Sequence, residues 1–203
     1  MSVQIGVVGQ VVSGRGMGTS RVLRYREELQ AIIKQPLYPG TLNILLNQPL
    51  RLLDNSGSVF DLEGGMVWPA MLGGMDVWIY RWRTCPLHIV EVISSVCLRE
   101  RFNLKDGDDV TLALSGAQVG AIETLGRFAW AALWIGRRND FFLRDSCHTV
   151  SNKTMYWSMK LGALQQQPGV KGVRELSHFV TEEIIRGAAA GYAMVARRLK
   201  IRP

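Results

Sequence analysis

The chain has 203 residues, 47% hydrophobic and 20% charged, which is the composition of an ordinary globular protein with one large or two small domains. Its longest apolar stretch, at 128–136, is far shorter than the roughly 20 residues that cross a bilayer, and the first residues lack the pattern of a secretory signal. The cysteines lack paired spacing and favour reduced thiols, so we expect a cytoplasmic protein without a membrane span.

The first part of the chain is predicted to consist mainly of strands. Short apolar runs bounded by turn residues lie at 3–12, 43–46, 76–82 and 109–114. Two helices are expected between them, at 21–33 with Thr19 or Ser20 as N-cap, and at 88–102, where the β-branched residues also suit a strand. Strands that outnumber helices, without regular alternation, favour a small barrel over a doubly wound sheet.

A glycine cluster, SGRGMGTS at 13–20, follows the first predicted strand. Alternating glycines let the backbone approach a ligand closely, and its N–H groups can line a phosphate at the start of the next helix. The cluster is not a Walker A motif, because Gly18 is followed by Thr19 rather than by lysine. A flexible hairpin loop is the alternative reading of this pattern.

Thr41 and Asn43 are two polar residues in the otherwise apolar run LYPGTLNILL at 37–46. Residues i and i+2 of a strand point the same way, so the two side-chain oxygens can converge on one point. The pair suits either a hard cation or a hydrogen-bonded edge of the core.

The order VVSGRGMGTS, YPGTLN, RTCPLHIVEVIS and VCLRERFNLKDGDDV resembles the archaeal CTP-dependent riboflavin kinases over residues of about 4–114. The resemblance implies a six-stranded cradle-loop barrel. With the C-terminal helical region that we expect beyond the resemblance, the fold class is α+β. The resemblance further implies transfer of the γ-phosphoryl group of CTP to the terminal hydroxyl of riboflavin, giving FMN and CDP.

The resemblance also assigns roles to individual residues. Thr41 and Asn43 would coordinate Mg²⁺, and Thr84 and Glu91 would contact riboflavin, with Glu91 as the base or the orienting group. The cytidine nucleotide would be held by Gly14, Arg15, Gly16, Met17, Gly18, Thr19, Ser20, Val96, Cys97, Leu98 and Arg99. Alternatively, Glu91 pairs with a nearby arginine such as Arg83 or Arg99 and has only a structural role.

The acceptor side departs from the family pattern at WIYRWRTCPLH, 78–88, so a kinase for another small alcohol is an alternative. Trp78 and Trp82 could stack on a flavin ring, but barrel packing is favoured. A barrel that binds nucleotide or nucleic acid without turnover is the second alternative, although a net charge of +7 is usually solvated surface. No zinc or catalytic role is assigned to Cys85 with His88, to Cys147 with His148, or to His178.

A domain boundary is predicted near residue 116. Residues 1–116 contain 11 basic and 11 acidic residues, whereas residues 117–203 contain 13 and 6. Helices are expected at 126–138 and 177–200, the second with Ser177 as N-cap. We expect residues 117–203 to form a mainly helical basic layer that packs on a barrel of residues 1–116.

Overall fold

A computed structural model of the chain describes residues 3–14, 16–61, 64–82, 85–122, 124, 127, 130 and 131. The chain divides into two compact units, Met1–Gly162 and Ala163–Pro203, and all described residues belong to the first. The predicted helix at 177–200 lies outside them.

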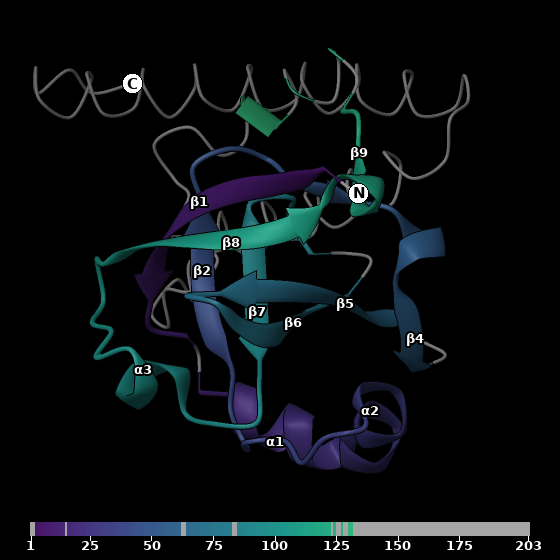
Figure 1. The fold of residues 1–203 in the computed structure, drawn as a ribbon, viewed down its shortest axis with the longest axis vertical. Helices are drawn as coiled ribbons and strands as arrows, with labels where there is room; N and C mark the ends of the chain where they lie inside the picture. The colour runs from purple at the N-terminus through teal and green to yellow at the C-terminus, as the bar shows by residue number, and fades with distance from the viewer. Residues whose placement is uncertain are drawn as a thin grey trace, which may run out of the picture. The chain divides into compact units, whose positions relative to one another are not determined.

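Six antiparallel strands form a closed barrel, which confirms the predicted fold (Figure 1). They follow one another around the barrel in the order β5-β6-β7-β2-β1-β8, and pairing between β5 and β8 closes it. The six strands are β1 (Gln4–Val12), β2 (Leu42–Leu46), β5 (Gly65–Leu72), β6 (Met75–Trp82), β7 (Ile89–Ile93) and β8 (Asp109–Ser115). The short strand β4 (Ser58–Asp61) extends the sheet beside β5, and β3 (Arg51–Leu52) pairs with β9 (Val119–Gly120).

Of the elements whose bounds fall within the described residues, three are short α-helices: α1 (Gly18–Arg24), α2 (Arg26–Ile33) and α3 (Leu98–Arg101). Two 3-10 turns lie at Asp54–Ser56 and Gly116–Gln118. None of the helices in this part of the chain has the length and apolarity needed to cross a bilayer.

Alternation along the strands separates the barrel interior from its outer face. On β2, Leu42, Ile44 and Leu46 belong to the main core cluster. Asn43 and Leu45 therefore point outward. Side chains from β5, β6, β7 and β8 complete the interior, among them Trp68, Ile79, Val92 and Leu112.

Pro69 in the middle of β5 explains why this strand was not among those predicted, because proline removes a donor from a ladder. One edge of β5 pairs with β4 through residues 65–67 and with β8 through residues 71–72, so Pro69 falls between the two partners. Its carbonyl accepts a hydrogen bond from Gln118 Nε2 at 2.8 Å.

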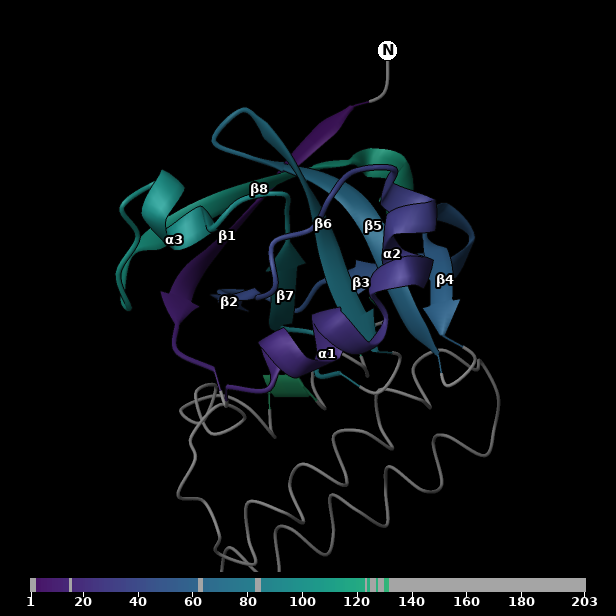
Figure 2. The same ribbon diagram turned by 90° about the horizontal axis from the view of Figure 1, so that it is seen from below.

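The predicted helix at 21–33 is two helices, because the chain bends at Tyr25 between α1 and α2. The predicted N-cap was wrong: Met17 occupies that position without a side-chain bond, and Ser20 Oγ donates to the Met17 carbonyl at 3.0 Å. The buried face of the pair, including Val22 and Leu29, packs on outward residues of β4, β5 and β6. Figure 2 shows α1 and α2 beside these strands.

The predicted helix at 88–102 was wrong in its first half, where the structure has the strand β7. Every residue of Ile89–Ile93 is buried, since the interior lies on one face and a second packed layer on the other. A strand buried on both faces has no visible period of two, so its pattern resembles that of a buried helix. Only Leu98–Arg101 is helical.

Residues beyond 116 contact the barrel. Gln118 accepts a hydrogen bond from the Ser115 amide at 2.7 Å, and β9 pairs with β3. Trp130 Nε1 donates to Nδ1 of the fully buried His88 at 3.0 Å. The boundary near 116 stays a prediction, because most residues that would test it lie outside the described ranges.

Candidate functional site

A cleft of about 360 Å³ lies between three segments of the chain. One wall is the glycine-rich connection from β1 to α1, within residues 13–21, and another is the turn into β2 at 38–43. The third comes from β7 and the segment that leads into α3, within residues 91–99. The cleft therefore collects the motifs that sequence analysis singled out.

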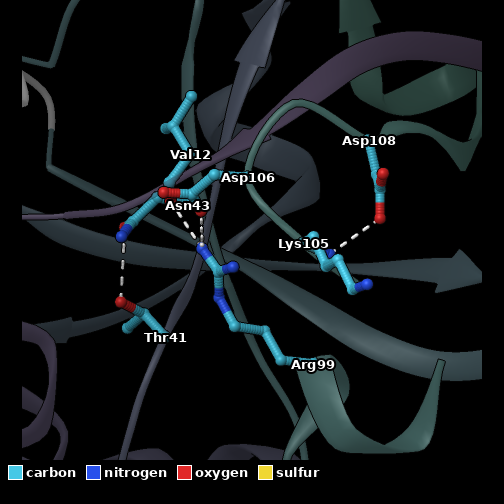
Figure 3. A network of polar contacts seen from close by, with 7 residues as sticks. All are labelled: Val12, Thr41, Asn43, Arg99, Lys105, Asp106 and Asp108. Atoms are coloured by element: carbon cyan, nitrogen blue, oxygen red, sulfur yellow. Dashed lines mark hydrogen bonds and ion pairs between the residues drawn. The ribbon is translucent and has the colours of Figure 1, made fainter. Parts of the chain in front are cut away.

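Thr41 and Asn43 lie together on the outer face of the barrel at this cleft. The Thr41 hydroxyl donates to Asn43 Oδ1 at 3.4 Å, as Figure 3 shows. In a Mg²⁺ octahedron neighbouring ligand oxygens are about 3 Å apart. The pair thus fits two neighbouring positions of such an ion, provided that other oxygens supply the rest.

The glycine-rich connection lies directly against these two side chains. A Cβ atom added to Gly14 would overlap the Asn43 amide nitrogen, and one added to Gly18 would overlap Thr41 Oγ1. Gly16 between them has a φ of +74°, a conformation that L side chains rarely adopt. Glycine is thus required here for close approach and for the turn.

Glu91 is buried beside the same pair. It lies opposite Asn43 in the pairing of β2 with β7, and it is only 7% exposed. Burial raises the pKa of Glu91, while the positive charge of Arg21 and a hydrogen bond from Thr41 lower it, and the net shift is upward. Its carboxylate is accordingly a stronger proton acceptor than an exposed glutamate.

Arg21 of α1 supplies a positive charge close to Glu91, with Nη1 3.6 Å from Oε1. Two other arginines were predicted as partners of Glu91. Arg99 instead donates hydrogen bonds to Val12 and Asp106, and Arg83 lies outside the described residues. Arg21 lines the cleft and was missed from sequence. The available signal was a cation placed three residues after the last glycine of the cluster.

Arg99 fastens the start of the glycine-rich connection. Its Nη2 donates to the Val12 carbonyl at 2.9 Å and to Asp106 Oδ1 at 2.7 Å (Figure 3). Burial alone raises the pKa of Asp106, but hydrogen bonds from Ser13 and Arg99 outweigh it and lower the pKa. The Lys105–Asp108 turn is thereby held against the end of β1, where the Gly107 amide also donates to the Val11 carbonyl at 2.9 Å.

An aromatic cluster lies on the other side of Glu91. Tyr80, opposite Glu91 in the pairing of β6 with β7, stacks on Phe60 at 5.0 Å, and Trp82 and Tyr25 meet these rings edge-on. Tyr80 and Trp82 therefore take part in packing between the barrel and the α1–α2 pair. Within the described ranges, neither the buried Tyr80 hydroxyl nor the buried Trp82 Nε1 has a partner at hydrogen-bond geometry. Burial and then the Glu91 charge raise the pKa of Tyr80, and the nearby Trp82 N–H only partly offsets this rise.

Most of the residues assigned to nucleotide binding line this one cleft: Gly14, Gly16, Met17, Gly18, Thr19, Val96, Cys97, Leu98 and Arg99. Ser20 is exposed and is not part of the lining. Arg15 and Thr84 lie outside the described residues.

Cys85 and His88 of the C-P-L-H segment are both buried. Burial raises the pKa of the Cys85 thiol to about 11, which keeps it protonated at neutral pH. Across the described ranges, no group of three histidine, cysteine or acidic side chains gathers around one point.

Comparison with known proteins identifies the family. The sequence model of the CTP-dependent riboflavin kinases, described as a domain of unknown function, DUF120, matches residues 11–114. The chain belongs to this family. The match contains the whole cleft, from the glycine-rich connection to Arg99.

Individual relatives carry the name riboflavin kinase. The chain is 34% identical to one from Thermococcus kodakarensis over 120 residues, with 52% of this chain and 57% of that protein covered. It is also 34% identical to one from Saccharolobus solfataricus over 127 residues, covering 53% and 73%, and 29% identical to one from Methanocella arvoryzae, covering 52% and 55%. The chain thus spans little more than half the length of two of these relatives.

Proposed function

We propose that the protein is a riboflavin kinase that uses CTP as its phosphoryl donor. The observation that carries the proposal is a single cleft lined by a glycine-rich connection, two neutral side chains with oxygen atoms, Thr41 and Asn43, and a buried carboxylate. Membership of the CTP-dependent riboflavin kinase family supports the choice of donor and acceptor.

The donor's phosphates would lie along the glycine-rich connection, where close approach is possible only without side chains. Thr41 and Asn43 would hold a Mg²⁺ ion that arrives with the nucleotide. Bound there, the ion would neutralise phosphate charge. Two neutral protein ligands bind such an ion weakly, so metal and nucleotide would bind together.

The acceptor hydroxyl would lie at Glu91. The oxygen of the acceptor hydroxyl forms a bond to the γ-phosphorus of CTP. At the same time the bond from that phosphorus to the oxygen that bridges it to the β-phosphorus breaks, and CDP leaves with the electron pair. The hydroxyl proton passes to the Glu91 carboxylate, whose burial raises its affinity for a proton. Positioning and charge neutralisation supply most of the rate in such transfers.

The test is to incubate the pure protein with Mg²⁺, riboflavin and either CTP or ATP, and to measure FMN. We expect FMN to form with CTP and to form more slowly with ATP. Equal or faster turnover with ATP would refute the donor assignment. Consumption of CTP with another alcohol but not with riboflavin would refute the acceptor assignment.

The metal assignment predicts the behaviour of a double variant, Thr41→Ala with Asn43→Ala. Binding of Mg²⁺–CTP, measured by calorimetry, should weaken at least about tenfold, whereas binding of CTP in EDTA should change little, because both removed groups serve the ion. A folded double variant with unchanged Mg²⁺–CTP affinity would contradict it.

A further inference from the structure

Arg21 occupies the junction between the two halves of the cleft. Gly18 and Arg21 are three residues apart on α1 and therefore lie on the same face of that helix. Gly18 lies against Thr41, on the donor side, while Arg21 lies 3.6 Å from Glu91, on the acceptor side. In the proposed arrangement, a phosphoryl group transferred from the Thr41 side to the Glu91 side would lie close to this guanidinium.

Among the described residues, the guanidinium of Arg21 has no partner within hydrogen-bond distance. A distance of 3.6 Å to Glu91 exceeds the 2.7–3.2 Å typical of a hydrogen bond, and the Arg21 side chain is 35% exposed. Arg99, the other cation among the described lining residues, is different, because its Nη2 donates at 2.9 Å and 2.7 Å to Val12 and Asp106. Arg99 thus holds the loop, whereas Arg21 lines the cleft and makes no hydrogen bond to another side chain that the structure describes.

Phosphoryl transfer builds negative charge on the oxygens of the transferring group, and an arginine at that point stabilises the transition state more than the bound donor. We propose that Arg21 is a catalytic residue that donates hydrogen bonds to the transferring phosphoryl group. This inference rests on the proposed kinase function. The loose pair with Glu91 holds the guanidinium near the transfer path before the substrates bind.

The kinetic test uses Arg21→Gln, Arg21→Lys and a matched control, Arg24→Gln. Arg24 lies on the same helix and stacks over the Tyr25 ring at 5.2 Å, outside the cleft lining. We expect Arg21→Gln to lower kcat at least about 100-fold with less than about a threefold change in the KM for CTP. Arg21→Lys should recover part of the loss, and the control should keep the wild-type rate.

A binding test separates a contact to the phosphoryl group from an indirect role. CDP with aluminium fluoride imitates the planar transferring group, whereas CDP alone does not. Arg21→Gln should weaken binding of the CDP–fluoroaluminate complex by about the same factor as kcat and leave the Kd of CDP unchanged. Equal losses for both ligands, or an unchanged kcat, would overturn the inference.

A double variant addresses the Glu91 pair. If Arg21 acts only through Glu91, Arg21→Gln will have no further effect on fluoroaluminate binding in a Glu91→Gln background, and the inference fails; we expect the effect to persist. Should Arg21→Gln not fold, the affinities of Arg21→Lys for CDP and for the CDP–fluoroaluminate complex are compared instead.

Absence of FMN formation by the wild-type protein would refute the proposed function, whereas FMN formation that is insensitive to Arg21 would refute only this inference.

Discussion

The glycines of the connection from β1 to α1 lie in contact with the two proposed metal ligands. Gly18→Ala would place a methyl group into Thr41 Oγ1 and push the loop away from the cleft. We expect at least about a tenfold loss of Mg²⁺–CTP affinity and a stability loss of about 1–3 kcal/mol from overpacking. Calorimetric titration and urea unfolding would measure the two effects.

Gly6→Ala is the matched control for that substitution. Gly6 lies on the exposed side of β1, and an added Cβ would meet only the Thr111 methyl group at 3.3 Å, which can rotate away. This variant should keep wild-type affinity and stability within about 0.5–1 kcal/mol. Equal effects of the two substitutions would contradict a special role for Gly18.

Glu91 combines a functional advantage with a cost in stability. Because burial raises the pKa of Glu91 above its ordinary value of 4.5, the folded protein holds this proton more tightly than the unfolded chain. Protonation of Glu91 therefore contributes to the free energy of unfolding. This contribution is fully present below pH 4.5 and is lost as the pH rises through the raised pKa of the folded state.

Glu91→Gln should therefore melt at a higher temperature than the wild type at neutral pH. The difference in melting temperature should shrink as the pH falls from the raised folded-state pKa of Glu91 toward 4.5. The same variant should lose at least about 100-fold in kcat, because glutamine cannot accept the proton. Thermal melts at several pH values and FMN formation would test both. A stability difference that does not change with pH would count against an ionised buried carboxylate.

At the scale of elements, Arg81 of β6 joins three segments at one end of the barrel. It is 5% exposed and donates to the carbonyls of Ile89, at 2.7 Å, and Leu50, at 2.9 Å. Burial lowers the pKa of Arg81 to about 10, so it remains charged at neutral pH. It ties the start of β7 and the approach to β3 to the end of β6.

Arg81→Met would leave these carbonyls buried without a donor, and we expect a loss of about 3 kcal/mol or more in the free energy of unfolding. Arg51→Met is the control, since its guanidinium makes one exposed bond, to the Ala121 carbonyl at 3.1 Å, and the loss should stay below about 1 kcal/mol. Urea denaturation would compare them. Similar midpoints for the two variants would be evidence against this role of Arg81.

Some elements could be predicted from sequence because only one of their faces is apolar or because turn residues bound them, as in β1 and β8. Others could not, for physical reasons. In β7 both faces are buried, so a period of two is hidden, and in β5 the proline breaks the expected pattern. The pairing of Thr41 with Asn43 was predictable from strand geometry, whereas the approach of Arg21 to Glu91 depends on how α1 folds back over the barrel.

At the scale of the whole molecule, the barrel is not independent of residues beyond 116. Gln118 bonds to Pro69 and, through its carbonyl, accepts from the Leu53 amide at 2.9 Å. Trp130 donates to His88, a fully buried residue that directly precedes β7. These contacts join residues 118–130 to the barrel, and that residues 117–203 form an integral layer and not a detachable module stays a prediction.

Three lengths of the chain separate these contributions: residues 1–116, residues 1–122 and the full chain. Removing residues 117–122 takes away Gln118 and β9, so residues 1–116 should be the least stable. Residues 1–122 should regain those bonds but lack Trp130 and the aromatic residues that follow, each worth roughly 1.5–3 kcal/mol if buried. Since a domain's total stability is about 5–15 kcal/mol, we expect both fragments to melt below the full chain and to form FMN more slowly.

Expression, thermal melting and FMN formation would be compared across the three. A soluble fragment of residues 1–116 that melts cooperatively at the full-chain temperature with full kinase activity would identify residues 117–203 as a dispensable appendage.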